Sequence, residues 1–155
     1  MKIKRMTSSP AETKKIGKTL GKFLRAGDVL ALAGELGAGK TTLVQGIAKG
    51  LGVMDEKSVS SPTFVLTHEY QGREKIYHLD WYRLSRVRGA DAEMAEEYFS
   101  SGAVTLVEWP EKGKSLLPPQ TVFVEILHRG NNRRALLFSF PAKTGAGIVK
   151  ALKKI

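Results

Sequence analysis

Apolar residues along the chain are spaced in two ways, one typical of strands and one typical of helices. Residues 29–33 read VLALA, an unbroken apolar run that is typical of a strand buried on both faces of a parallel sheet. Residues 103–107, AVTLV, form a second run of this kind. Helical spacing of apolar positions predicts helices over residues 10–25, 42–48 and 90–99, and a short C-terminal helix that carries Ile148, Leu152 and Ile155. The first of these helices should begin with a capping box formed by Ser9 and Glu12.

Two further pairs of segments predict β-hairpins. Residues 64–70 and 75–82 are rich in β-forming side chains and flank the turn sequence QGRE, so the two strands should be antiparallel. Residues 121–127 and 133–140 flank RGNN and predict a second hairpin. Buried runs, hairpins and helices together predict an α/β fold in three layers, whose central sheet mixes parallel and antiparallel strands. The length suits a single domain over residues 1–155.

The composition excludes several kinds of site. The chain has no cysteine, so disulfides, thiol catalysis and a thiolate metal site are ruled out. The N-terminal MKIKRMTSSP is charged and lacks the apolar segment of a signal peptide, and no later run approaches the roughly 20 apolar residues of a membrane span. We therefore expect a cytoplasmic protein with no membrane partner.

The net charge of +10 has two interpretations. Lys14, Lys18 and Lys22 line the side of the first helix that its apolar residues leave free, which is how an ordinary solvated face looks. Further arginines and lysines are scattered toward the C-terminus, where they would also suit a polyanion. The charge favours a solvated surface but leaves contact with tRNA open, either direct or within a complex.

Residues 34–41, GELGAGKT, fit the P-loop pattern G-x-x-x-x-G-K-[ST]. Its glycines let backbone N–H groups approach phosphate oxygens, and the following helix adds the positive end of its dipole. Lys40 supplies a charge for the β- and γ-phosphates of a nucleotide, and the Thr41 hydroxyl can bind a Mg²⁺ ion that bridges them. The predicted order of strand, loop and helix supports this motif. The nucleotide-binding residues expected here are Gly34, Leu36, Gly37, Ala38, Gly39, Lys40, Thr41 and Thr42.

Two carboxylates can complete such a site. Glu108 directly follows the buried run at 103–107, where P-loop enzymes place an acidic residue, usually Asp, that holds the metal or orients water. His78 and Asp80 share one face of a strand, so the imidazole and the carboxylate can orient each other, and Asp80 can hold a water. His78 is equally well explained as a structural histidine. Thr63, in the loop SPTF, is a candidate for a switch threonine.

Four segments, GELGAGKTT, SPTF, YHLDWYRL and LVEWPEK, occur in this order over residues 34–112, about half of the chain. They resemble the TsaE family, the bacterial ATPase component of the machinery that places threonylcarbamoyl on an adenosine beside the anticodon of tRNA. The resemblance implies a P-loop NTPase fold, ATP with Mg²⁺, and partnership with the TsaD–TsaB transferase pair. It also implies an arginine that approaches the nucleotide from the last hairpin; Arg133 fits, although Asn132 stands where family members often have glycine.

The leading hypothesis is thus an ATPase that supports turnover of the tRNA-modifying complex. Lys40, Asp80 and Glu108 would be its catalytic residues, with Thr41 and Glu108 at the metal. Because no arginine lies beside the P-loop in the sequence, we expect slow hydrolysis by the isolated chain and acceleration by its partners. The alternatives are a small-molecule kinase with a basic lid, a GTPase-like switch, which lacks an [NT]-K-x-D segment, and a binding module with an inactive nucleotide site. The lid arginines would be Arg83, Arg86 and Arg88.

Overall fold

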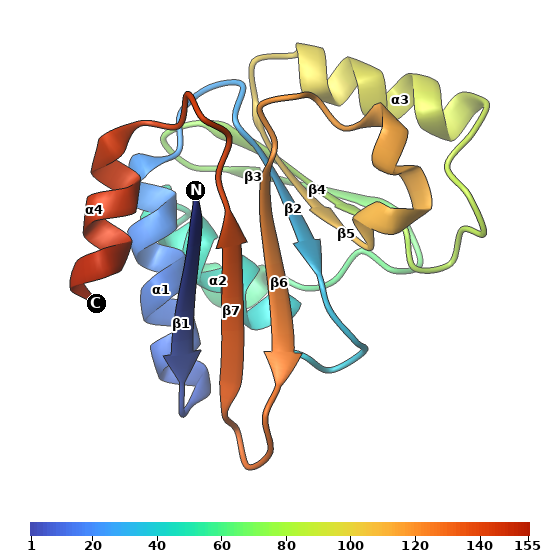
Figure 1. Cartoon of the computed structure of the whole chain (residues 1–155). Coiled ribbons are helices and arrows are strands. Elements are labelled where there is room, and N and C mark those ends of the chain that lie inside the picture. Colours follow the sequence, from blue (N-terminus) through green and yellow to red (C-terminus); the bar gives the residue numbers. More distant parts are fainter.

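The computed structural model describes residues 1–155 and contains one seven-stranded sheet with helices packed on it (Figure 1). The strands are β1 (Lys2–Thr7), β2 (Val29–Ala33), β3 (Thr67–Gln71), β4 (Lys75–Asp80), β5 (Val104–Glu108), β6 (Val122–His128) and β7 (Arg134–Ser139). The α-helices are α1 (Pro10–Phe23), α2 (Lys40–Gly50), α3 (Ala90–Ser100) and α4 (Ala146–Lys154). Two 3-10 helices are η1 (Glu56–Ser58) and η2 (Pro110–Leu116).

The strands lie in the order β1-β7-β6-β2-β5-β4-β3. The central strands are parallel: β2 pairs with β5 and β6, and β4 pairs with β5. β1, β7 and β3 join in antiparallel orientation. The predicted α/β fold with a mixed sheet is therefore confirmed. In the parallel part, Asp80 is the register partner of Glu108, and Glu108 is the partner of Leu32, so three neighbouring strands end side by side next to the predicted phosphate loop.

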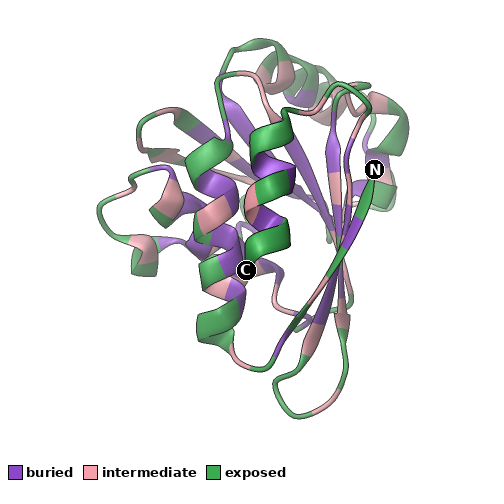
Figure 2. Ribbon diagram, turned by 60° about the vertical axis from the view of Figure 1, so that its left-hand side comes forward, coloured by how far each residue is buried: buried purple, intermediate pink, exposed green.

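One face of the sheet is covered by α1, α2 and α4, whose buried sides face the strands (Figure 2). Leu20 of α1 and Leu43 and Ile47 of α2 are completely buried in this core. The expected Ser9 cap is present, because Ser9 Oγ accepts from the Glu12 amide at 3.2 Å, while the Glu12 carboxylate accepts at 2.6 Å from the amide of Ser8, one residue before the N-cap. The apolar spacing seen in the sequence thus corresponds to the sides that these helices bury.

Glycines allow α1 and α2 to touch backbone to backbone. A Cβ on Gly21 would overlap the carbonyl oxygen of Ile47, and a Cβ on Gly46 would overlap the carbonyl oxygen of Lys14. Such contacts leave no room for a side chain between the two helices. The helix that follows the predicted phosphate loop is therefore fixed closely against α1.

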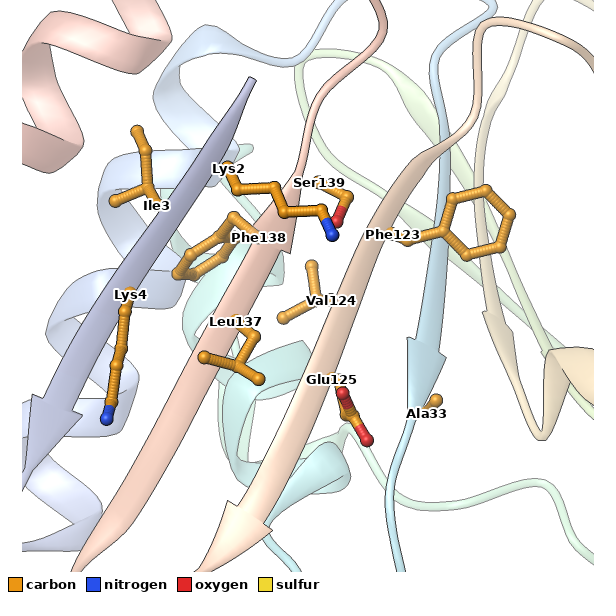
Figure 3. Close-up of a pocket in the computed structure, with 10 residues that line it drawn as sticks. All are labelled: Lys2, Ile3, Lys4, Ala33, Phe123, Val124, Glu125, Leu137, Phe138 and Ser139. Carbon is orange, nitrogen blue, oxygen red and sulfur yellow. The ribbon is translucent and has the colours of Figure 1, made fainter.

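Helices cover only part of the opposite face of the sheet. α3 and η2 pack over β2, β5 and β4 around a smaller apolar cluster that includes Leu79, Trp81 and Val107. No helix covers this face of β1, β7 and β6 (Figure 1). Here the sheet forms an open hollow of about 460 Å³, which we call the sheet groove (Figure 3). Its lining residues are Lys2, Ile3, Lys4, Ala33, Phe123, Val124, Glu125, Leu137, Phe138 and Ser139.

The observed boundaries differ from the expected ones in a few places. β1 was not predicted, since KIKRMT is short and half of its residues are charged. The expected strand 64–70 begins only at Thr67, because the amide of Leu66 donates to the carbonyl oxygen of Pro62 at 2.7 Å and forms a turn. The first helix ends at Phe23, and α2 begins at Lys40. None of the helices combines the length and the apolar character that crossing a bilayer requires.

Candidate functional site

The turn between β2 and α2 has the backbone shape of a phosphate loop. Gly39, at the N-terminus of α2, has φ of 109°, and Gly37 has φ of 77°; both angles lie in the region that favours glycine. Gly34 packs so closely on β6 that a Cβ would lie 2.7 Å from the carbonyl oxygen of Ile126. No side chain caps α2, so its first amide groups are available to an anion.

Lys40 lies inside this loop. Its Nζ donates to the carbonyl oxygens of Gly34 at 2.6 Å and Glu35 at 2.9 Å and lies 4.4 Å from the ring centre of Trp109. Burial lowers the pKa of the Lys40 ammonium, while the charges of Glu108 and Asp80 oppose that change. A partly dehydrated ammonium of this kind would gain more from a phosphate oxygen than an exposed lysine would.

Most of the residues that the sequence assigned to the nucleotide line one hollow of about 330 Å³, which we call the P-loop pocket. Its lining residues are Leu36, Gly37, Gly39, Lys40, Thr41, Thr42, Ser61, Thr63, Asp80, Glu108 and Trp109. Gly34 and Ala38 shape the loop without lining the pocket. The P-loop pocket and the sheet groove have no lining residue in common.

Asp80 is a buried carboxylate bound by neutral donors. Its Oδ2 accepts from Ser61 Oγ at 2.5 Å and from Thr63 Oγ1 at 2.9 Å, and its Oδ1 accepts from the Tyr82 amide at 2.8 Å. These bonds compensate for part of the loss of hydration. They also fasten the segment that carries Thr63 to the end of β4.

Glu108 is bound by a histidine of the neighbouring strand. Its Oε2 lies 2.7 Å from His78 Nε2, and the side chains of His78 and Glu108 are 0% and 2% exposed. The other ring nitrogen, Nδ1, lies 3.2 Å from Tyr70 Oη. His78 and Asp80 do share a face of β4, but the parallel register turns His78 toward Glu108 and leaves Asp80 to the 60–63 segment.

The last hairpin contributes a different arginine contact from the expected one. Arg133 is exposed at the hairpin end, and its backbone pairs with Arg129 and Gly130. Arg134 instead donates from Nε to the carbonyl oxygen of Ala38 at 2.6 Å. Arg133 lies in the turn before β7, whereas Arg134 is the first residue of that strand and is the arginine that contacts the loop. The sequence shows the arginine pair but not which member faces the loop.

The donors in the P-loop pocket suit magnesium that arrives with a nucleotide. A hydroxyl, Thr41, and two carboxylates, Asp80 and Glu108, line the same hollow, and oxygen is the donor that Mg²⁺ prefers. No three His, Asp or Glu side chains are grouped so that they alone would hold a metal ion. Phosphate oxygens and water would have to supply the remaining ligands.

Comparison with known proteins identifies relatives over most of the chain. Residues 7–136 match the family model described as threonylcarbamoyl adenosine biosynthesis protein TsaE. A Bacillus subtilis protein named tRNA threonylcarbamoyladenosine biosynthesis protein TsaE is 40% identical over 141 residues, covering 88% of this chain and 85% of its own. Its namesake from Treponema pallidum is 38% identical over 121 residues, covering 78% and 88%. The crystal structure of YdiB from Bacillus subtilis has a TM-score of 0.79 at 34% identity, covering 99% of this chain and 95% of that one.

Proposed function

This chain belongs to the TsaE family, and from that premise we propose that it binds ATP with Mg²⁺ and hydrolyses it. Hydrolysis would support turnover of the machinery that forms threonylcarbamoyladenosine in tRNA. One observation carries the proposal: Lys40, Asp80 and Glu108 line the same pocket at the start of α2, and all three are buried. Buried charged groups that are gathered in one cleft are typical of sites that bind a charged ligand or catalyse a reaction.

Different residues of the pocket would bind the phosphates, hold the metal and orient the attacking water. The amides at the start of α2 and the ammonium of Lys40 would bind the β- and γ-phosphates, after Lys40 exchanges its two carbonyl partners for phosphate oxygens. Thr41 and Glu108 would hold Mg²⁺, which neutralises developing charge on the phosphates when it is bound. Asp80 would orient the attacking water, since it lies beside Glu108 and close to the hydroxyl of Thr63.

Several groups that hydrolysis needs are occupied in the isolated chain. Two of the hydrogen bonds of Asp80 go to the 60–63 segment, and Arg134 is bonded to the carbonyl oxygen of Ala38. Transition-state charge on the γ-phosphate is commonly stabilised by an arginine, often one supplied by a partner. The chain should therefore hydrolyse ATP slowly alone, and the TsaD–TsaB pair should accelerate it by ordering or completing the pocket. The excess of positive charge would bring the assembly close to tRNA.

Steady-state phosphate release tests the proposal. It should be measured for the purified chain with ATP and Mg²⁺, alone and after addition of the TsaD–TsaB pair. Slow release alone and an increase of about tenfold or more with the pair are expected. Fast release that the partners leave unchanged would contradict partner dependence, and no release under either condition would contradict the ATPase proposal.

A further inference from the structure

A chain of hydrogen-bonding groups links Glu108 to the 60–63 segment without passing through the P-loop pocket. Glu108 Oε2 lies 2.7 Å from His78 Nε2, and His78 Nδ1 lies 3.2 Å from Tyr70 Oη. Tyr70 Oη also lies 3.2 Å from the carbonyl oxygen of Ser60. The segment that binds Asp80 directly is thereby connected to the second carboxylate as well.

The Tyr70 hydroxyl has one proton and two acceptors at equal distance. When a neutral His78 donates from Nε2 to Glu108, its Nδ1 is left as an acceptor. The hydroxyl can then donate to His78 or to Ser60, but not to both. Burial raises the pKa of Tyr70, with a smaller opposing contribution from the Ser60 carbonyl, so the hydroxyl keeps this proton in neutral solution.

The Ser60 carbonyl has an alternative donor when Tyr70 turns away from it. His68 Nδ1 lies 3.1 Å from that oxygen and 3.2 Å from Tyr70 Oη. In the tautomer with a proton on Nδ1, His68 can donate to either of them. Both arrangements of the Tyr70 proton therefore leave the Ser60 carbonyl bonded, whereas the buried His78 Nδ1 has a donor only when the Tyr70 hydroxyl turns to it.

We propose that Tyr70 is a positioning residue that transmits movement of the 60–63 segment to Glu108 through His78. Thr63 lines the P-loop pocket and bonds to Asp80, so a γ-phosphate that takes the Thr63 hydroxyl would shift the segment. As Ser60 moves away, the Tyr70 hydroxyl donates to His78, which fixes the imidazole and hence Glu108. Binding at the phosphate end thus releases Asp80 and orients Glu108 in one movement. This inference rests on the proposed ATPase function.

The variant Tyr70→Phe removes the hydroxyl and keeps the ring. We expect kcat for ATP hydrolysis to fall by about tenfold, as when a group that orients a catalytic carboxylate is lost. KM and the Kd of a fluorescent ATP analogue should change less than twofold, because Tyr70 does not line the P-loop pocket. Tyr98→Phe is the matched control: Tyr98 packs on Tyr77 with ring centres 4.2 Å apart, outside the network, and should behave as wild type.

A second measurement detects the change of hydrogen-bond acceptor of the Tyr70 hydroxyl and requires no ATP hydrolysis. The chain has 3 histidines, so the ring nitrogens can be assigned by ¹⁵N NMR of histidine-labelled protein. A non-hydrolysable ATP analogue with Mg²⁺ should shift the His78 Nδ1 resonance in the wild type and in Tyr98→Phe, but not in Tyr70→Phe.

The outcomes separate the two proposals. A wild-type chain that does not bind the analogue would overturn the ATPase function, and the relay with it. Wild-type binding without a shift of His78 Nδ1 would overturn the relay alone. So would a Tyr70→Phe variant with normal kcat, or one whose KM rises in step with the loss of kcat.

Discussion

The P-loop pocket and the sheet groove are two hollows of the same sheet with opposite chemistry. The groove is the larger, about 460 Å³ against about 330 Å³, and side chains such as Leu137 and Phe123 line it. The smaller pocket contains three buried charged side chains, and the carboxylates have hydrogen-bond partners outside the phosphate loop. Volume is therefore a poor guide to function in this molecule. Charges that are held buried by specific partners are a better one, since burying them is unfavourable for folding alone.

The sharpest test of this contrast exchanges one lysine in each region. Lys40→Ala should lower ATP hydrolysis by about a thousandfold, because it removes the fixed cation that meets developing phosphate charge. Lys4→Ala, in the groove, should leave the rate within about twofold of wild type. Phosphate release and analogue binding measure both. Comparable losses in the two variants would show that net charge, rather than the pocket, controls binding.

A pair of glutamates gives the next largest difference. Glu108→Gln should reduce kcat by about a hundredfold while some nucleotide affinity remains, because a neutral amide replaces the group that holds the metal or orients water. Glu125→Gln, on the exposed groove side of β6, should hydrolyse ATP at the wild-type rate. Single-turnover and steady-state rates distinguish the chemical step from binding. Normal hydrolysis by Glu108→Gln would remove that residue from the mechanism.

A third pair of variants tests the packing of α1 against α2 and leaves every polar group of the P-loop pocket in place. Gly46→Ala inserts a methyl group against the backbone of Lys14 and should lower the free energy of unfolding by about 2 kcal/mol. Gly145→Ala meets no atom within 4 Å and should change it by less than about 0.5 kcal/mol. Urea unfolding measures both. Equal stability of the two variants would mean that α1 and α2 can move apart at little cost.

The smallest expected effect lies in the groove itself. Leu137→Ser makes the floor of the groove polar, and Leu137 does not line the P-loop pocket. ATP hydrolysis by the isolated chain should stay within about twofold of wild type. A larger change would mean that the groove and the pocket are coupled through β6 and β2. It would contradict the view that the two hollows are independent.

The sequence predicted the features that depend on local pattern. The apolar runs identified β2 and β5, and the P-loop pattern identified the turn and the start of α2. The position of Glu108 at a strand end follows from where its apolar run stops. Asp80 was expected inside a strand over residues 75–82, but β4 ends at Asp80. The glycines that join α1 to α2 are visible as repeated four-residue spacings, but nothing in one sequence says which helices they bring together.

Other features of the site depend on register, which a single sequence does not contain. Whether His78 faces Asp80 or Glu108 is decided by the pairing of β4 with β5. The choice between Arg133 and Arg134 is decided by the alignment of β7 with β6, where Arg134 is the partner of His128. Tyr70 and Ser61 were missed for the same reason, since their roles appear only when the 60–63 segment folds over β4.

The position of β1 has a consequence for synthesis on the ribosome. β1 pairs only with β7, and Thr7 is the register partner of Arg134. At typical rates of translation, β1 is synthesised on the order of 10 seconds before β7. During that time its unpaired edge could join another nascent chain. Lys2, Lys4 and Arg5 place positive charge along this edge, and like charges on neighbouring chains would repel each other until β7 arrives.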